Sequence, residues 1–193
     1  MKKKECWEGI FCILGLFLIV PQLLDFILSI FISEEYLNIL SRIITMVIIF
    51  LYLNFKYKNS DTFIDKIAGF SNTKLKSIII LFIIGIFVIL TNDINISKEI
   101  PYIVGGIFIA PFIEEIMFRG YIQYLVTECY GDVYGILFTS LIFTFMHSQY
   151  YGNIAAIIGV FLCSLFLCYL KYKYKNIIYP SIIHMLNNFI ALI

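Results

Sequence analysis

Two adjacent carboxylates and one guanidinium lie in an otherwise apolar segment, Pro111-Phe-Ile-Glu-Glu-Ile-Met-Phe-Arg-Gly-Tyr121. An ionisable residue at the centre of a bilayer helix costs about 2.5 to 3.5 kcal/mol on insertion scales, so this clustering indicates a functional site. On a helix, Glu115 and Arg119 are four residues apart and share one face, with the acid before the base. Glu114 is rotated by about 100° from Glu115, so the two acids cannot share a partner on that face. The spacing therefore predicts a paired Glu115 and a Glu114 that is free to act.

The two histidines of the chain, His147 and His184, also lie in apolar segments. Phe143 precedes the first by four residues and Asn188 follows the second by four, so each pair shares one helix face. A carboxylate and an imidazole can take a proton from water, while a second imidazole and a carboxamide can donate to a developing oxyanion. Two histidines and a glutamate are also a known catalytic zinc set. The residues therefore predict hydrolysis by activated water, or a metal site formed by Glu114 and both histidines.

These motifs resemble those of the CPBP intramembrane peptidases, which include the CAAX prenyl endopeptidases and the bacteriocin-processing or bacteriocin-immunity proteins. The resemblance rests on E-E-x-x-x-R, F-x-x-x-H and H-x-x-x-N, in that order, and covers about residues 102–193. It implies that Glu114 activates the water, with His147 as its partner. It further implies that His184 and Asn188 form an oxyanion hole. Glu115 and Arg119 would form an ion pair that supports the site.

The resemblance leaves the type of peptidase open, because the family fits either a glutamate-type or a metal-dependent mechanism. The glutamate-type mechanism needs no cofactor. The metal-dependent one needs a divalent ion such as zinc, for which the candidate ligands are Glu114, His147 and His184. The spacing of these residues does not match H-E-x-x-H, so it gives no support to a zincin helix.

The composition is that of an integral-membrane protein. The chain has 193 residues, of which 61% are hydrophobic and 14% charged, against about 25% charged in an ordinary soluble domain. We expect a single all-α domain, with variable N-terminal spans in residues 1–100 and the peptidase core in residues 101–193. Its expected partners are membrane lipid and a peptide or membrane-protein substrate, and nothing in the net charge of +1 indicates nucleic acid. The five cysteines show no C-x-x-C spacing and are expected to be free.

The apolar runs predict a bundle of about seven transmembrane helices, with the catalytic core in the last four. The predicted spans are about residues 10–32, 36–55, 77–91, 102–125, 133–147, 154–170 and 177–193. A short interfacial helix is predicted at residues 63–70. Pro21 is expected to kink the first span, and Pro111 to interrupt the fourth.

The lysines predict the orientation in the membrane. If the N-terminus is inside, every lysine except Lys98 falls in the inside segments 2–4, 56–76 and 171–175. We therefore expect a multi-pass protein of the cell membrane with a cytoplasmic N-terminus and an external C-terminus. This topology places His147 near the outer end of its span. It would approach Glu114 if the fifth helix began near Gly135 and continued past His147, or if the helices were tilted and staggered.

Three functions follow from these features. The first is an intramembrane endopeptidase that uses Glu114 and His147 to activate water. The alternative is a non-catalytic bacteriocin self-immunity or membrane-binding protein of the same fold. A third is a proton or ion carrier in which Glu114 and the histidines form a relay, although no pair of broken-helix repeats supports it.

Overall fold

The computed structural model describes residues 3–32, 34–56 and 104–192, and all regular elements within these ranges are helical. The predicted all-α fold is therefore confirmed for the described part of the chain. The helices outside residues 104–130 are α1 (Lys3–Leu28), α2 (Glu34–Lys56), α8 (Asp132–Phe145), α9 (Ile154–Tyr174) and α10 (Ile178–Leu192). The 3₁₀ turn η4 (Ser148–Tyr150) follows α8.

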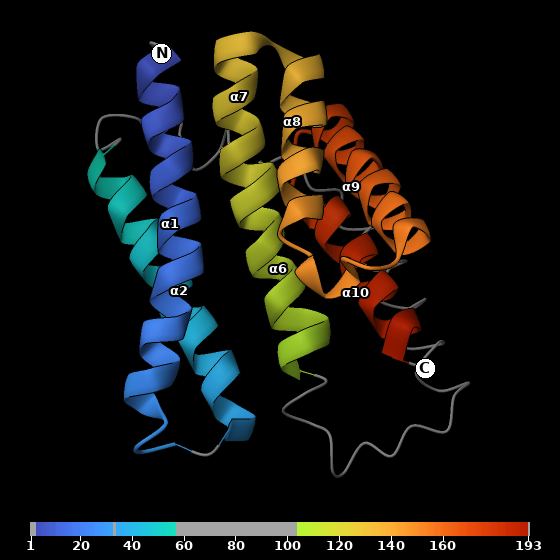
Figure 1. Cartoon of the computed structure of the whole chain (residues 1–193). Coiled ribbons are helices and arrows are strands. Elements are labelled where there is room, and N and C mark those ends of the chain that lie inside the picture. Colours follow the sequence, from blue (N-terminus) through green and yellow to red (C-terminus); the bar gives the residue numbers. More distant parts are fainter. Residues whose placement is uncertain (1–2, 33, 57–103, 193) are drawn as a thin grey trace.

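Between α2 and α8 one continuous helical segment, residues 104–130, forms the centre of the molecule, and we call it the central helix. It consists of η2 (Val104–Ile109), α6 (Ala110–Glu115), η3 (Ile116–Ile122) and α7 (Gln123–Tyr130). The two η segments are π-helical, and π-helical turns are frequent at functional sites. In Figure 1 the antiparallel pair α1 and α2 lies on one side of the central helix, and α8, α9 and α10 lie on the other.

The central helix continues through Pro111 and changes its hydrogen-bond pattern there. In a π-helix each carbonyl accepts from the N–H five residues later, so the carbonyl of Gly106 would pair with residue 111. Proline has no N–H, and η2 ends at Ile109, after which Pro111 lies in the first turn of α6. The predicted interruption is thus a change of register and not a break in the helix. The first helix likewise continues through Pro21 to Leu28.

The membrane prediction is supported in part. Two of the described helices, α1 and α9, are long and apolar enough to cross a membrane. On α9 the exposed side chains include Ile158, Leu162 and Phe166, which are four residues apart and share one face. A continuous apolar face of this kind is typical of lipid contact. The predicted span 77–91 and the interfacial helix 63–70 lie outside the described residues.

The core joins the N-terminal pair to the central helix. Ile10 and Ile13 of α1 and Ile49 of α2 are buried in one cluster with apolar residues of the central helix and α8. Polar contacts supplement this packing, because Cys6 Sγ donates to the carbonyl of Leu125 at 3.2 Å. All five cysteines are free thiols, as the sequence predicts. The core therefore holds α1 and α2 against the helix that carries both acids.

Candidate active site

A fully buried ion pair joins Glu115 and Arg119. Arg119 Nη1 donates to Glu115 Oε1 at 2.8 Å, and both side chains have no exposed surface. This is the pair predicted from their spacing of four residues. Arg119 also reaches two neighbouring helices, because Nη2 donates to Ser164 Oγ of α9 at 2.8 Å and the guanidinium lies 4.2 Å from the ring centre of Phe143 in α8. The pair therefore connects the central helix with α8 and α9.

His184 of α10 lies between the two acids. Its Nδ1 lies 2.8 Å from Glu115 Oε1, and its Nε2 lies 3.9 Å from Glu114 Oε2. A carboxylate can only accept hydrogen bonds, so Nδ1 carries the hydrogen in the contact with Glu115. Glu115 thus orients the ring with Nε2 toward Glu114. The result is a row of acid, imidazole and acid within an apolar bundle.

Glu114 differs from its neighbour in exposure and in partner. Its side chain is 18% exposed, whereas that of Glu115 is fully buried, so Glu114 is the acid that water can reach. Arg42 of α2 places Nη1 3.6 Å from Glu114 Oε1. The prediction of a Glu114 without a charged partner is therefore wrong. Arg42 comes from a distant part of the chain, so no local spacing could have shown this contact.

His147 follows the end of α8 and does not contact the acids. Its Nδ1 donates to the carbonyl of Phe143 at 2.7 Å, and the two rings lie 4.3 Å apart. Among the described residues, neither a hydrogen bond nor an ion pair joins His147 to Glu114. Of the two arrangements that would bring His147 toward Glu114, the structure excludes a fifth helix that begins near Gly135 and continues past His147, because α8 begins at Asp132 and ends at Phe145.

Phe143 connects the parts of the site. Its ring contacts His147 and Arg119, as described above. The same ring lies 5.6 Å from the ring of His184 and 5.0 Å from that of Phe118, both in edge-on geometry. The face of an aromatic ring attracts a cation, which suits the contact with the guanidinium. Phe143 is itself buried. The phenylalanine of the F-x-x-x-H motif therefore contacts both histidines and the buried cation.

Asn188 of α10 contacts the backbone of the central helix. Its Nδ2 donates to the carbonyl of Gly106 at 3.1 Å, the carbonyl that would pair with residue 111 in π-helical geometry. Because Pro111 has no N–H, the side chain of Asn188 supplies the donor that the backbone lacks. An amide nitrogen carries two hydrogens, so this bond orients the group and leaves a second hydrogen for another acceptor.

This contact gives a first prediction. Replacing Asn188 by Leu leaves the Gly106 carbonyl without its donor and is expected to reduce the free energy of unfolding by about 1 to 3 kcal/mol. Pro111→Ala restores a backbone N–H at position 111, so Asn188→Leu is expected to cost less in that background. Unfolding of all four proteins by SDS titration in mixed micelles measures the difference. An equal cost in both backgrounds would contradict the proposed link between Pro111 and Asn188.

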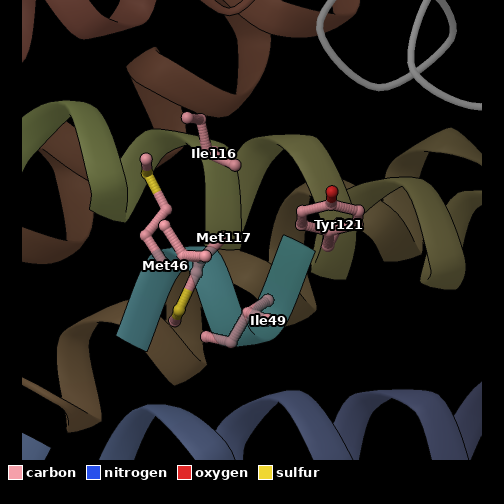
Figure 2. Close-up of a pocket in the computed structure, with 6 residues that line it drawn as sticks. Met46, Ile49, Ile116, Met117 and Tyr121 are labelled. Atoms are coloured by element: carbon pink, nitrogen blue, oxygen red, sulfur yellow. The ribbon is translucent and has the colours of Figure 1, made fainter. Parts of the chain in front are cut away.

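An apolar cavity of about 170 Å³ lies between α2 and the central helix. Met46, one helical turn after Arg42, and Ile116, two residues after Glu114, both line it. Figure 2 shows the labelled side chains meeting there from the two helices. The remaining lining residues are Val47, Ile49, Met117 and Tyr121. The cavity therefore lies between the helix that carries Arg42 and the helix that carries Glu114.

The candidate metal ligands do not form a metal centre. Glu114 and His184 approach each other at 3.9 Å, but among the described residues no ion pair joins His147 to either acid. No group of three or more His, Cys, Asp or Glu residues in the described ranges has an arrangement that could hold a metal ion. The residues as placed therefore do not fit a three-ligand zinc site, and we derive no step that uses a metal.

Three contributors to the site carry no motif in the sequence. Arg42 and Ser164 are polar residues in apolar runs, which is the only sequence signal of their contacts with Glu114 and Arg119. Gly106 contributes a backbone carbonyl, and its signal is the proline five residues later. Each contact depends on how the helices pack and not on a local spacing.

Comparison with known proteins identifies the region that contains these motifs. Residues 96–190 match the family model described as type II CAAX prenyl endopeptidase, Rce1-like. All three motifs lie within this range, and the family that they resemble is confirmed. The search of curated proteins and the search of solved structures found no match.

Proposed function

Because the chain belongs, through residues 96–190, to the Rce1-like family of type II CAAX prenyl endopeptidases, we propose that it is an intramembrane endopeptidase. This is a membrane-embedded protease family, so its members act on peptides or proteins. The reaction that we propose is hydrolysis of a peptide bond in a membrane-associated substrate. The observation that carries this proposal is the partly exposed Glu114 beside a histidine that a second, buried acid holds in place.

Glu114 is the proposed general base. It takes a proton from a water molecule, the hydroxide attacks the carbonyl carbon of the substrate, and the same carboxyl group later gives the proton to the leaving amine. We propose His147 as a second acceptor for this water. Its Nδ1 donates to the Phe143 carbonyl, so Nε2 of the neutral ring has a free lone pair.

His184 and Asn188 are the proposed donors to the oxyanion. The amide of Asn188 has a second hydrogen beyond the one used on the Gly106 carbonyl, and that bond fixes its orientation. His184 can donate from Nε2 only when the ring carries both protons, because Nδ1 is already committed to Glu115. Hydrogen-bond donors that are fixed before the reaction stabilise the developing charge without reorganisation. We propose that the buried Glu115 and Arg119 serve to fix His184 in this way.

The apolar cavity between α2 and the central helix supports a substrate with an apolar group near the cleaved bond. All six side chains that line it belong to α2 or the central helix, which carry Arg42 and Glu114. A cavity of about 170 Å³ accommodates a large aliphatic or aromatic side chain. We therefore propose membrane-associated peptides, cleaved beside a large apolar residue, as the substrate class.

Incorporation of heavy oxygen tests the proposed hydrolysis. The purified protein in liposomes would be incubated with membrane-tethered peptides in ¹⁸O-labelled water, with and without a metal chelator. Hydrolysis is expected to place one ¹⁸O in each new carboxyl group, detected by mass spectrometry. Cleavage that persists with chelator supports the glutamate-type mechanism, and loss that zinc restores supports a metal-dependent one. Peptides that bind equally to the wild-type and Glu114→Gln proteins but never gain ¹⁸O would favour the non-catalytic binding or immunity function.

A further inference from the structure

A polar row runs along one face of the central helix, from the buried acid to the helix end. Glu115, Arg119, Gln123 and Thr127 follow one another at intervals of four residues, so they share one face. Three of them, Glu115, Arg119 and Gln123, are buried although the surrounding residues are apolar. The proposed hydrolysis uses only the first two residues of this row. Gln123 and Thr127 therefore have no role in the site described above.

Helix α9 presents polar groups to this row. Arg119 donates to Ser164 Oγ, and one turn further along Gln123 Nε2 donates to the carbonyl of Cys168 at 3.0 Å. Lys171 follows on α9 and is also buried. The two helices are therefore joined by polar contacts over successive turns, where an ordinary helix pair would have apolar packing.

A cavity of about 250 Å³ lies between the same helices. It extends from the buried Arg119 and Gln123, past Thr127, to Asp132 and Lys175, which are exposed. Asp132 begins α8 and Lys175 directly follows α9, at the end of the bundle where α7 meets α8 in Figure 1. The cavity therefore connects the outside of the bundle with the guanidinium that holds Glu115.

Buried atoms along the row match the hydrogen-bonding capacity of water. The Nε–H of Arg119 and the Oε1 of Gln123 are buried and have no hydrogen-bond partner among the described residues, and both residues line the cavity. One water molecule can accept from the first and donate to the second. Glu115 Oε2 is a further buried acceptor without a partner in the described chain. Polar cavities of this size hold water, whereas apolar ones stay dry.

We propose that this polar row and its cavity form a hydration path, which carries water from the end of the bundle to Glu115 and Arg119. The inference rests on the proposed function in one respect, since each hydrolysed peptide bond consumes one water molecule and the path ends at the residue next to the proposed base, Glu114. An anion is a poorer fit for the cavity. Glu128 and Asp132 line it together with Lys171 and Lys175, so it carries both signs of charge.

Reactivity of introduced cysteines tests the path without any need for cleavage. Gln123→Cys would be compared with Phe166→Cys in a background in which Cys12, Cys129 and Cys163 are Ala. Phe166 lies on the exposed apolar face of α9, two residues from the carbonyl that Gln123 contacts, so the two positions have similar depth. The probe is 2-aminoethyl methanethiosulfonate, applied to the full chain in liposomes and followed by mass spectrometry.

The thiol of Gln123→Cys is expected to react about tenfold faster than that of Phe166→Cys, because the reactive thiolate forms in water and not in lipid. If Gln123→Cys lowers the unfolding temperature, Thr127→Cys replaces it as the cavity position, because it is a smaller change on the same cavity wall. Equal rates at the cavity and lipid-facing positions would overturn the path. Protection of the cavity positions by inorganic phosphate would also overturn it, because it would indicate an anion site.

A second measurement separates this inference from the proposed function. Gln123→Met keeps the length of the side chain but removes its polar atoms, and it is expected to lower kcat about tenfold with KM unchanged if the path supplies water. Unchanged kcat in a protein that cleaves would overturn the role in catalysis. If the wild-type protein does not cleave, the cysteine rates still show whether the path is hydrated, so the two failures remain distinguishable.

Discussion

Replacing Glu114 by Gln is expected to lower kcat for peptide cleavage by about 10²- to 10⁴-fold, the usual contribution of a general base. The amide has nearly the same shape as the carboxylate but cannot accept the proton of the attacking water. The change should cost little stability, because the side chain is partly exposed and its contacts with Arg42 and His184 are long, at 3.6 and 3.9 Å. Turnover of a tethered peptide and thermal unfolding of the same preparation measure the two effects.

The adjacent acid provides the matched control for this prediction. Glu115 is fully buried and lies 2.8 Å from both Arg119 and His184, so Glu115→Gln is expected to lower the unfolding temperature clearly. Glu114→Gln should therefore be the stable, inactive protein, and Glu115→Gln the less stable one. Wild-type turnover by Glu114→Gln would remove Glu114 from the mechanism. Low turnover accompanied by a large loss of stability would instead indicate a structural acid.

The geometry that the sequence predicts correctly is the geometry that a single helix determines. Glu115 and Arg119 meet because four residues make about one turn, and no other part of the chain is needed for that contact. The same rule places His184 and Asn188 on one face of α10. Both then contact the central helix, one through a carboxylate and the other through the Gly106 carbonyl.

The contacts that the sequence does not predict arise between helices. Arg42 reaches Glu114 from α2 at 3.6 Å, and His184 reaches it from α10 at 3.9 Å. No residue spacing in the sequence predicts either contact, because each depends on the depth and rotation of one helix against another. The length of α8 shows the same limit. An apolar run predicts that a helix exists but places its end only within a few residues, and here that end decides where His147 lies.

Replacing Arg119 by Met is expected to reduce the free energy of unfolding by about 3 to 5 kcal/mol, the usual cost of removing one partner from a buried ion pair. The carboxylate of Glu115 would keep only its contact with His184. Ser164 Oγ would lose the hydrogen bond that it accepts from Arg119. Met has a similar length, so the loss reflects charge and hydrogen bonds more than volume. SDS titration in mixed micelles measures the unfolding free energy.

The double variant Glu115→Gln with Arg119→Met shows whether the two residues act as a pair. If the main cost is an uncompensated buried charge, neutralising Glu115 should recover part of the stability lost in Arg119→Met, and the two changes should not be additive. Ser164→Ala is the milder comparison, with an expected cost of about 1 kcal/mol, because it removes one hydrogen bond and leaves the ion pair intact. Additive costs for Glu115 and Arg119 would contradict the pairing. A cost for Arg119→Met no larger than that of Ser164→Ala would show that the guanidinium contributes little beyond its bond to α9.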